Sequence, residues 1–335
     1  MKSHKKSYLK LAVALCAILV LAIGAYFGMQ AIEKAIVDKA DAEIMSGLPQ
    51  DKYGRVTYKD KKYKPKSRLT TTLIIGLDEF GEVEEDSNSS KNIKMADFLT
   101  LFVFDEVEKN CKVIHINRDT MMNVPVLGVF GDKAGTAYKQ IAWAHTYGSG
   151  LDDSCRNTAD AVSSLLYDIT IDNYISLTMD AVSILNDKVG GVEVDVKDDL
   201  TALDGNLVPG TTVKLTGSQA LTFVRARLGV GDSSNLSRME RQKEYMSSFV
   251  DSLTAAYNAD NSFVLDATEA VGDFMVTDCT AGELAELASN VSTYTIGEIV
   301  SPKGTSTAGE EYMEHFVDED ALMDLVIETF YTEVK

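Results

Sequence analysis

Arginine is concentrated in one short segment of this chain. After residue 70 the sequence contains six arginines, and four of them (Arg225, Arg227, Arg238 and Arg241) fall within 17 residues. The planar guanidinium group stays charged at physiological pH and suits bidentate contact with phosphate oxygens. We expect Arg238 to lie in the first turn of a helix, where unpaired backbone N–H groups favour an anion. The segment therefore predicts a phosphate-binding pocket, with surface ion pairs as the alternative.

Three aspartates lie at the ends of predicted strands. Asp78 directly follows one β-rich apolar run, Asp97 precedes a second, and Asp119 follows a third, immediately after Arg118. Alone, each is typical of a turn or a helix cap. Beside arginines and a polyphosphate, carboxylates supply the hard oxygen ligands that Mg²⁺ requires. The set therefore predicts a Mg²⁺ site next to the phosphate pocket.

Apolar runs alternate with helical patterns in the region that carries these residues. The predicted strands are 71–77, 98–104, 112–117, 171–178 and 192–196, and the predicted helices are 158–167 and 180–188. Short continuous apolar runs suit strands that are buried on both faces. We predict an α/β domain whose central, mainly buried β-sheet is covered by helices on both faces.

Two capping boxes mark helix starts further along the chain. Residues 216–219 (TGSQ) and 237–240 (SRME) each place a hydroxyl three positions before a Gln or Glu, and an apolar face follows each of them. This spacing satisfies two unpaired backbone donors at once. We therefore expect helices to begin after Thr216 and after Ser237.

The N-terminal residues predict a membrane anchor. Residues 2–10 contain four lysines and no acid, and residues 11–29 then carry no charge. As a helix, such a run spans roughly 30 Å, the thickness of the hydrocarbon core of a bilayer. Lysines on the N-terminal side are typical of the cytoplasmic face. A cleaved signal peptide, with small residues at 22–25, is the alternative, and both alternatives place the domain outside the cytoplasm.

This interpretation divides the chain into four parts. They are a basic cytoplasmic tail (1–10), a transmembrane anchor (11–32), a stalk or linker (33–69) and an extracytoplasmic domain (70–335). Within the stalk, 49–68 is expected to be a linker or a β-hairpin. Residues 1–70 contain 14 Lys/Arg against 6 Asp/Glu, a net charge of +8, and the remainder has a net charge of −27. So acidic a domain is a poor candidate for sequence-independent nucleic-acid binding, and we expect no nucleic-acid partner.

Six motifs between residues 73 and 242 resemble those of one known family. They are 73–78 (LIIGLD), 117–120 (NRDT), 171–174 (IDNY), 189–192 (VGGV), 215–227 (LTGSQALTFVRAR) and 237–242 (SRMERQ). The chain resembles the LytR–CpsA–Psr proteins of bacterial cell envelopes. The last two motifs are the most specific part of the resemblance.

The resemblance implies a phosphotransferase that acts in cell-wall assembly at the bacterial membrane. Such proteins move a glycopolymer, such as teichoic acid or capsule, with its proximal phosphate from a polyprenyl-pyrophosphate lipid to a peptidoglycan sugar hydroxyl. The resemblance implies that Asp78 and Asp97 hold Mg²⁺ and that Arg118 and Asp119 are catalytic. The substrate-binding residues that it implies are Arg225, Arg227, Arg238, Arg241 and Gln242. The lipid tail would lie in an apolar cavity of the α/β core.

The chain departs from the family pattern at three places. Phe80 stands where the family often has arginine, Met95–Ala96 replaces Arg-Ser, and Gln140–Ala142 replaces Lys-Ile-Asn. A lost charged hydrogen bond costs about 1.5–3 kcal/mol. A second hypothesis is therefore a non-catalytic, membrane-tethered module that binds polyprenyl-phosphate lipids.

Cysteine and histidine residues leave smaller questions open. Cys111 and Cys155 either form a disulfide outside the cell or remain free. His115 lies within an apolar strand, which favours a core role over a catalytic one. His145, near Trp143 and Tyr147, could line a pocket.

Overall fold

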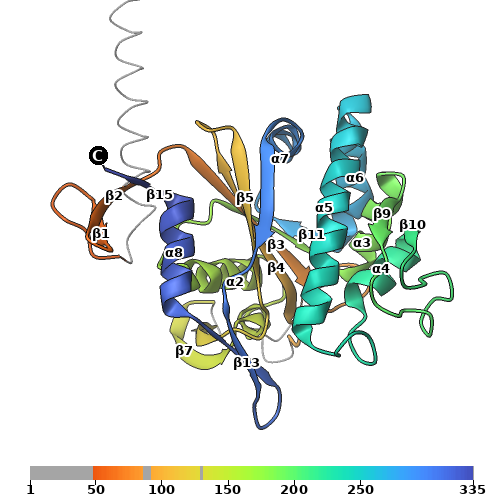
Figure 1. The fold of residues 1–335 in the computed structure, drawn as a ribbon, viewed down its shortest axis with the longest axis horizontal. Coiled ribbons are helices and arrows are strands. Elements are labelled where there is room, and N and C mark those ends of the chain that lie inside the picture. The colour runs from red at the N-terminus through yellow and green to blue at the C-terminus, as the bar shows by residue number, and fades with distance from the viewer. Residues whose placement is uncertain (1–47, 86–91, 129–130, 335) are drawn as a thin grey trace, which may run out of the picture.

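The computed structural model describes residues 48–85, 92–128 and 131–334 (Figure 1). Its strands are β1 Val56–Tyr58, β2 Lys61–Pro65, β3 Leu69–Leu77, β4 Ala96–Asp105, β5 Asn110–Ile116, β6 Met121–Leu127, β7 Lys133–Gln140, β8 Asn173–Leu177, β9 Val192–Asp195, β10 Thr212–Leu215, β11 Met275–Thr277, β12 Thr295–Val300, β13 Gly304–Ala308, β14 Met313–Val317 and β15 Tyr331–Glu333. Its α-helices are α2 Asp152–Leu165, α3 Met179–Lys188, α4 Gly217–Arg225, α5 Asn235–Ala259, α6 Phe263–Val271, α7 Ala281–Thr293 and α8 Glu319–Phe330. Two 3₁₀ helices lie at Ile141–Thr146 and Gly272–Phe274.

A six-stranded sheet forms the centre of the domain. Its strand order is β11-β8-β3-β4-β5-β12; β4 is antiparallel to its neighbours β3 and β5, and β8 and β12 are parallel to their inner neighbours. Strand β4 is buried at nine of its ten positions, as expected for a continuous apolar run in a central strand. The predicted α/β class is confirmed, and the sheet is mixed in direction.

Helices pack on both faces of this sheet (Figure 1). On one face, side chains such as Leu99 and Leu101 of β4 join the apolar sides of α2 and α8 in the largest core cluster. On the other face, Phe102 and Phe104 of the same strand pack with α5 and α7. Because successive side chains of a strand point to opposite faces of the sheet, β4 contributes to the cores on both sides.

A smaller core joins β9, β10, α3, α4 and the first half of α5. The capping box predicted at Thr216 is confirmed, because both of its reciprocal hydrogen bonds form at the start of α4. The start predicted for the next helix was wrong by one turn. Ser234 is the N-cap of α5 and accepts a hydrogen bond from the backbone of Ser237, the residue that the sequence pattern favoured as the cap.

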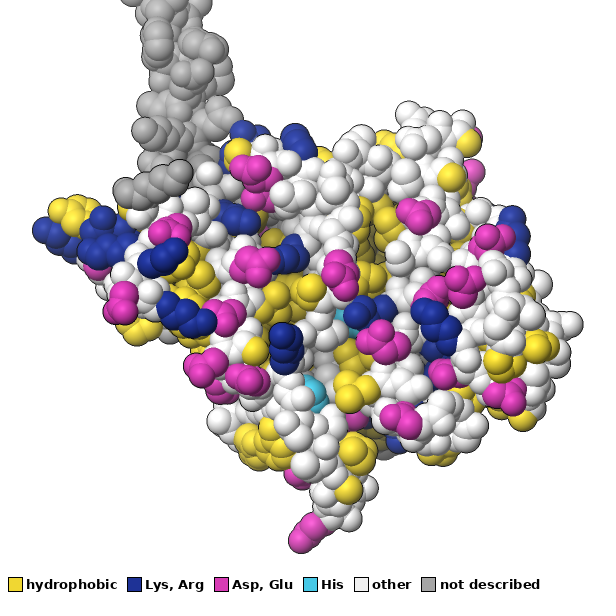
Figure 2. Space-filling model, viewed as in Figure 1, with side chains coloured by type: hydrophobic (Ala, Val, Ile, Leu, Met, Phe, Trp, Pro, Cys, Tyr) yellow, Lys and Arg dark blue, Asp and Glu magenta, His cyan; other side chains and the backbone are white. Residues whose placement is uncertain are grey.

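The described chain begins with a small basic sheet. Residues 49–68, expected to be a linker or a hairpin, form the β1–β2 hairpin, which pairs with β15. Leu48 and Val56 contribute to the main core, so the folded part extends before residue 70. Basic side chains gather over the β1–β2 region in Figure 2. Within the described residues no helix is long and apolar enough to cross a bilayer, and the predicted anchor at 11–32 lies outside them.

Candidate active site

A β-bulge places Asp97 at the junction of β3 and β4. Gly76 pairs with Phe98 and Leu77 with Ala96, which leaves Asp97 as the extra residue on β4. A bulge bends the strand and redirects a side chain. Glycine is required opposite the bulge, because a Cβ on Gly76 would lie 2.8 Å from Cβ of Phe98.

Asp97 joins two buried arginines. One carboxylate oxygen accepts from Nη1 of Arg118, which follows β5, and the other accepts from Nη1 of Arg238 at 3.0 Å. All three side chains are at most one-tenth exposed. A single carboxylate therefore compensates two guanidinium groups in a region of low dielectric, where charged hydrogen bonds are strong.

Two asparagines that sequence reasoning did not assign to the site hold α5 against the end of β5. Oδ1 of Asn235 accepts from Nη2 of Arg238 at 2.7 Å, and its Nδ2 donates to Oδ1 of Asn117 at 2.7 Å. Asn235 follows the α5 cap directly, and Asn117 precedes Arg118 in the NRDT motif. In the sequence, the signal for Asn235 was its position three residues before Arg238, because side chains at this spacing are neighbours on a helix.

Asp119 lies beside Arg118 but is buried. Its Oδ1 lies 3.5 Å from Nε of Arg118 and accepts from Nε2 of Gln140 at 2.8 Å. Burial raises the pKa of Asp119, and the positive charges of Arg118, Arg227 and Arg238 oppose that rise. Within the described residues, Nε of Arg118 is buried without a hydrogen-bond partner.

Arg225 and Arg227 project from the end of α4. Arg225 is half-exposed, with Nη2 at 3.4 Å from Oδ1 of Asp78 and its guanidinium 5.0 Å from the ring centre of Phe80. Arg227 is close enough to Arg238 for its charge to lower the pKa of that group, although burial is the larger cause. The two arginines at the end of α4 thus adjoin the pair held by Asp97.

Arg241 and Gln242 face the end of α4. Arg241 donates from Nε to the carbonyl of Phe223 at 3.2 Å, from Nη2 to the carbonyl of Ala226, and from Nη1 to Asp198 at 2.5 Å. Gln242 donates to the carbonyl of Val224 at 3.2 Å, and its Oε1 is buried without a partner in the described part of the chain.

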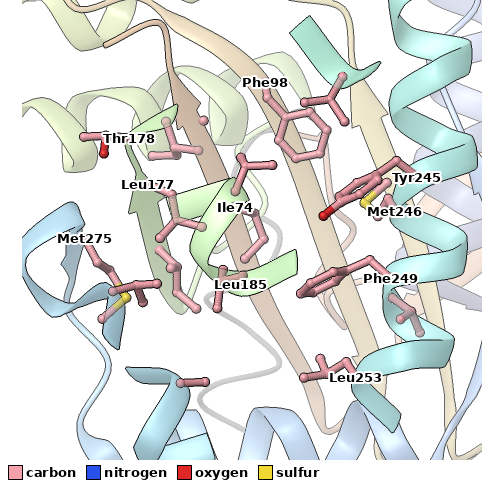
Figure 3. Close-up of a pocket in the computed structure, with 18 of the residues that line it drawn as sticks. Ile74, Phe98, Leu177, Thr178, Leu185, Tyr245, Met246, Phe249, Leu253 and Met275 are labelled. Carbon is pink, nitrogen blue, oxygen red and sulfur yellow. The ribbon is translucent and has the colours of Figure 1, made fainter. Parts of the chain in front are cut away.

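An apolar cavity of about 330 Å³ opens from this cluster. It lies between the sheet and helices α3, α5, α6 and α7, and its polar lining side chains include Asp97, Arg225, Arg238 and Gln242. Figure 3 shows Ile74, Phe98 and Leu177 facing Tyr245 and Phe249 of α5 across this space. The cavity combines apolar walls with a cationic group at one place, so its shape and chemistry suit an amphiphile with an anionic head.

Asp78 and Asp97 are the residues that would hold Mg²⁺ if a substrate phosphate completed its coordination. Asp78 follows Leu77, whose partner Ala96 precedes Asp97, so the two carboxylates lie at the same junction. Among the described residues, no group of three or more His, Cys, Asp or Glu could hold a metal. Mg²⁺ commonly uses one or two carboxylates, water and substrate phosphates. An ionised carboxylate offers about four lone-pair sites, so Asp97 can accept from two arginines and still contact a cation.

His115 and His145 belong to the core. Burial lowers the pKa of His115 to about 3, with Lys243 and Arg238 adding to the shift, and its ring lies 4.9 Å from that of Phe98. Burial likewise lowers the pKa of His145 to about 4. His145 contacts the carbonyl of Lys94 at 2.9 Å and does not line the cavity. The hypothesis that it lines a pocket is therefore not supported.

The possible Cys111–Cys155 disulfide does not form. Both thiols are free and buried, and burial raises their pKa values to about 12. Cys111 packs with the α5–α7 face of the sheet and Cys155 with the α2–α8 face. The sheet separates the two sulfur atoms.

The fold and the site define a class of α/β protein with a cationic cluster at an apolar cavity. The sequence profile described as the LytR_cpsA_psr family matches residues 36–324, and the chain belongs to this family.

Two curated relatives show how far the likeness extends. The chain is 28% identical over 260 residues to the polyisoprenyl-teichoic acid–peptidoglycan teichoic acid transferase TagT of Bacillus subtilis, covering 75% of this chain and 71% of that protein. It is 27% identical over 278 residues to the cell wall biosynthesis protein LcpA of Corynebacterium glutamicum, covering 72% of this chain but 52% of that protein.

Solved structures share the fold. Bacillus subtilis TagV matches with a TM-score of 0.58 and 22% identity over 78% of this chain and 97% of that chain. TagT bound to LI-WTA matches with a TM-score of 0.59 and 22% identity over 78% and 89%. The Streptococcus agalactiae protein gbs0355 gives 0.62 and 19% over 78% and 86%.

Proposed function

We propose that this protein is a Mg²⁺-dependent phosphotransferase of the cell envelope. It moves a glycopolymer, such as a teichoic acid, from a polyprenyl-pyrophosphate carrier to peptidoglycan. The observation that carries the proposal is the joint presence of an apolar cavity and a buried arginine, Arg238, in its wall, beside Arg118, which pairs with the same carboxylate. The transferase named in the Bacillus subtilis relative supports the same reaction class.

The cavity and the arginines bind different parts of the substrate. The apolar walls between the sheet and α5 take the polyprenyl tail, because burying it removes apolar surface from water. The pyrophosphate lies at the polar end, within reach of the two arginines that Asp97 holds. The buried Nε of Arg118, which has no hydrogen-bond partner in the described part of the chain, is a donor that a phosphate oxygen would satisfy.

The reaction exchanges a phosphoanhydride bond of the pyrophosphate for a phosphodiester bond to the acceptor. The acceptor hydroxyl oxygen forms a bond to the proximal phosphorus and releases its proton to water. The bond from that phosphorus to the bridging oxygen breaks, and polyprenyl monophosphate leaves. Such a transfer depends on positioning and on stabilising charge, which Arg118, Arg225 and Arg227 supply. Mg²⁺ bound at Asp78 and Asp97 would neutralise pyrophosphate charge.

The test uses the full chain in detergent with a polyprenyl-pyrophosphate-linked sugar and a peptidoglycan acceptor. We expect Mg²⁺-dependent cleavage that EDTA abolishes, measured by mass spectrometry of the released polyprenyl monophosphate. Arg118→Ala should lower kcat by at least about 100-fold, as removal of a preorganised charge donor does. Arg156→Ala is the matched control, because this arginine is exposed and pairs with Asp152 on α2.

A non-catalytic lipid-binding module is the second candidate. Phe80 lies under Arg225, and Sδ of Met95 accepts from Nη2 of Arg118 at 3.4 Å. Both residues therefore contact site arginines at positions where the family often supplies further arginines. Tight binding of the carrier without cleavage, with Mg²⁺ and acceptor present, would favour this candidate. Neither binding nor cleavage would reject both.

A further inference from the structure

The end of α4 is held by side chains from another helix. The last carbonyl groups of a helix have no partner within it. Arg241 of α5 donates to the carbonyls of Phe223 and Ala226, and Gln242 donates to the carbonyl of Val224. These carbonyls flank Arg225 on both sides and immediately precede Arg227. Contacts from α5 therefore fix the backbone that carries Arg225 and Arg227.

Asp198 fixes Arg241 in turn. It lies in the segment after β9 and accepts from Nη1 of Arg241 at 2.5 Å and from Oγ of Ser237 at 3.4 Å. The Arg241 side chain is 4% exposed and that of Asp198 is 25% exposed. Neither residue lines the cavity. A buried guanidinium without its carboxylate would lose its alignment with the α4 carbonyls.

The loop after Arg227 closes on the same residues. A Cβ on Gly231 would lie 2.2 Å from Oγ of Ser237 and 3.2 Å from Oδ1 of Asp198. Gly231 also has a φ of +55°, in the left-handed region. Asp198, Ser237 and Arg241 thus contact the arginine-bearing segment at its start and at its far end.

We infer that Asp198 and Arg241 are positioning residues for Arg225 and Arg227. The charge of Arg227 lowers the pKa of Arg238, so repulsion between these two groups would move an unsupported segment away from the site. The hydrogen bonds from Arg241 oppose that displacement and preserve the spacing of the phosphate-binding side chains. Arg241 acts on the pyrophosphate through this segment. The inference rests on the proposed function and specifies how its arginines are held.

The decisive variant is Asp198→Ala, made in the full chain. We expect kcat/KM to fall by about 10- to 100-fold, since a misplacement of about 1 Å in a catalytic group can cost 100-fold. The loss should lie mainly in kcat, because the cavity that binds the tail is unchanged. Asp198→Asn keeps an acceptor oxygen and should lose less. Asp199→Ala is the matched control, since Asp199 is exposed and bonds only locally to Thr201.

Two readouts separate this inference from the proposed reaction. Amide hydrogen exchange at residues 226–231 should accelerate in Asp198→Ala while exchange in β4 stays constant, and the affinity for inorganic pyrophosphate should fall. Unchanged exchange and unchanged pyrophosphate affinity would overturn the positioning role, whether or not the wild-type protein turns over the lipid substrate. Substitution at Asp198 is the better test than substitution at Arg241, because Asp198 is partly exposed whereas Arg241 is buried.

Discussion

Asp97 is the residue on which the buried charge of the site depends. Its carboxylate contacts Arg118 and Arg238, and all three side chains are nearly inaccessible to water. Breaking a buried pair costs more than forming it gains, because the remaining charge stays buried without compensation. Position 97 adjoins an apolar run in the sequence, which predicts a strand end. The bulge turns Asp97 toward two arginines that are distant in the sequence. It depends on the pairing of Phe98 with Gly76 and could not be predicted.

Asp97→Asn should therefore destabilise the fold as well as the site. We expect the free energy of unfolding to fall by about 3–5 kcal/mol, the usual loss when one partner of a buried ion pair is removed. Urea denaturation followed by circular dichroism measures it. Asp160→Asn is the control, because the Lys133–Asp160 pair is exposed and should contribute about 0–1 kcal/mol. Equal losses in the two variants would contradict the buried network.

His145 should make the stability depend on pH. Nδ1 of its buried ring lies 2.9 Å from the carbonyl of Lys94, which can only accept, so this nitrogen carries the proton of the neutral ring. Burial lowers its pKa from 6.5 to about 4. Between these values the unfolded chain binds more protons, so stability rises with pH. The contribution is complete above pH 6.5 and is lost as the pH falls toward 4.

The measurement is the free energy of unfolding at pH 7 and at pH 5. The wild-type protein should lose on the order of 2 kcal/mol from this group across the interval. His145→Phe should show a smaller difference between the two pH values, even if it is less stable at both. His115, whose pKa burial also lowers, keeps the difference from vanishing. An unchanged pH dependence in His145→Phe would show that the ring does not titrate as its burial requires.

At the scale of elements, α5 connects the site to the cavity. Its first turn carries Arg238, its second carries Arg241 and Gln242, and later turns supply Tyr245 and Phe249 to the apolar wall. The capping-box pattern at Ser237 predicted the helix but placed its start one turn late. Ser234 is the N-cap instead, because its side chain accepts a hydrogen bond from the backbone N–H of Ser237. Asn235 and Arg238, in the first turn of the helix, are hydrogen-bonded to each other within the site. Tertiary contacts of this kind override a local pattern.

Ser234→Ala tests the connection. Loss of an N-cap hydroxyl costs about 1 kcal/mol of stability, and here fraying would also loosen Asn235 and Arg238. Thr280→Ala removes the capping hydroxyl of α7, far from the arginines in the sequence. We expect similar losses of unfolding free energy in both variants, and a fall in the affinity for pyrophosphate only in Ser234→Ala. Calorimetric titration with inorganic pyrophosphate distinguishes them, and equal affinities would contradict the coupling.

At the scale of the whole molecule, the sequence predicts the sheet better than the cavity. Strands such as 71–77 and 98–104 are visible because continuous apolar runs report burial directly. The cavity requires α3, α5, α6 and α7 to meet over one face of the sheet, and no local pattern records which helices meet. The arginines and aspartates were identified by type and spacing. Of their partners, Asn235 left only the signal of its helical spacing from Arg238, and Asp198 emerged only from tertiary contacts.

In the proposed mode of binding, the apolar cavity holds the polyprenyl tail and the arginines hold the pyrophosphate, so the two can be disturbed separately. Leu253 lines the cavity from α5, and Leu253→Trp should occupy space that a polyprenyl tail needs. We expect the affinity for polyprenyl pyrophosphate to fall about tenfold, the equivalent of about 1.4 kcal/mol, while inorganic pyrophosphate binds as before. Leu265→Trp, at an exposed position of α6, should change neither. Calorimetry with both ligands measures these affinities. If Leu253→Trp lowered the two affinities equally, the assignment of the tail to this cavity would be contradicted, because the substitution would have disturbed the pyrophosphate site instead.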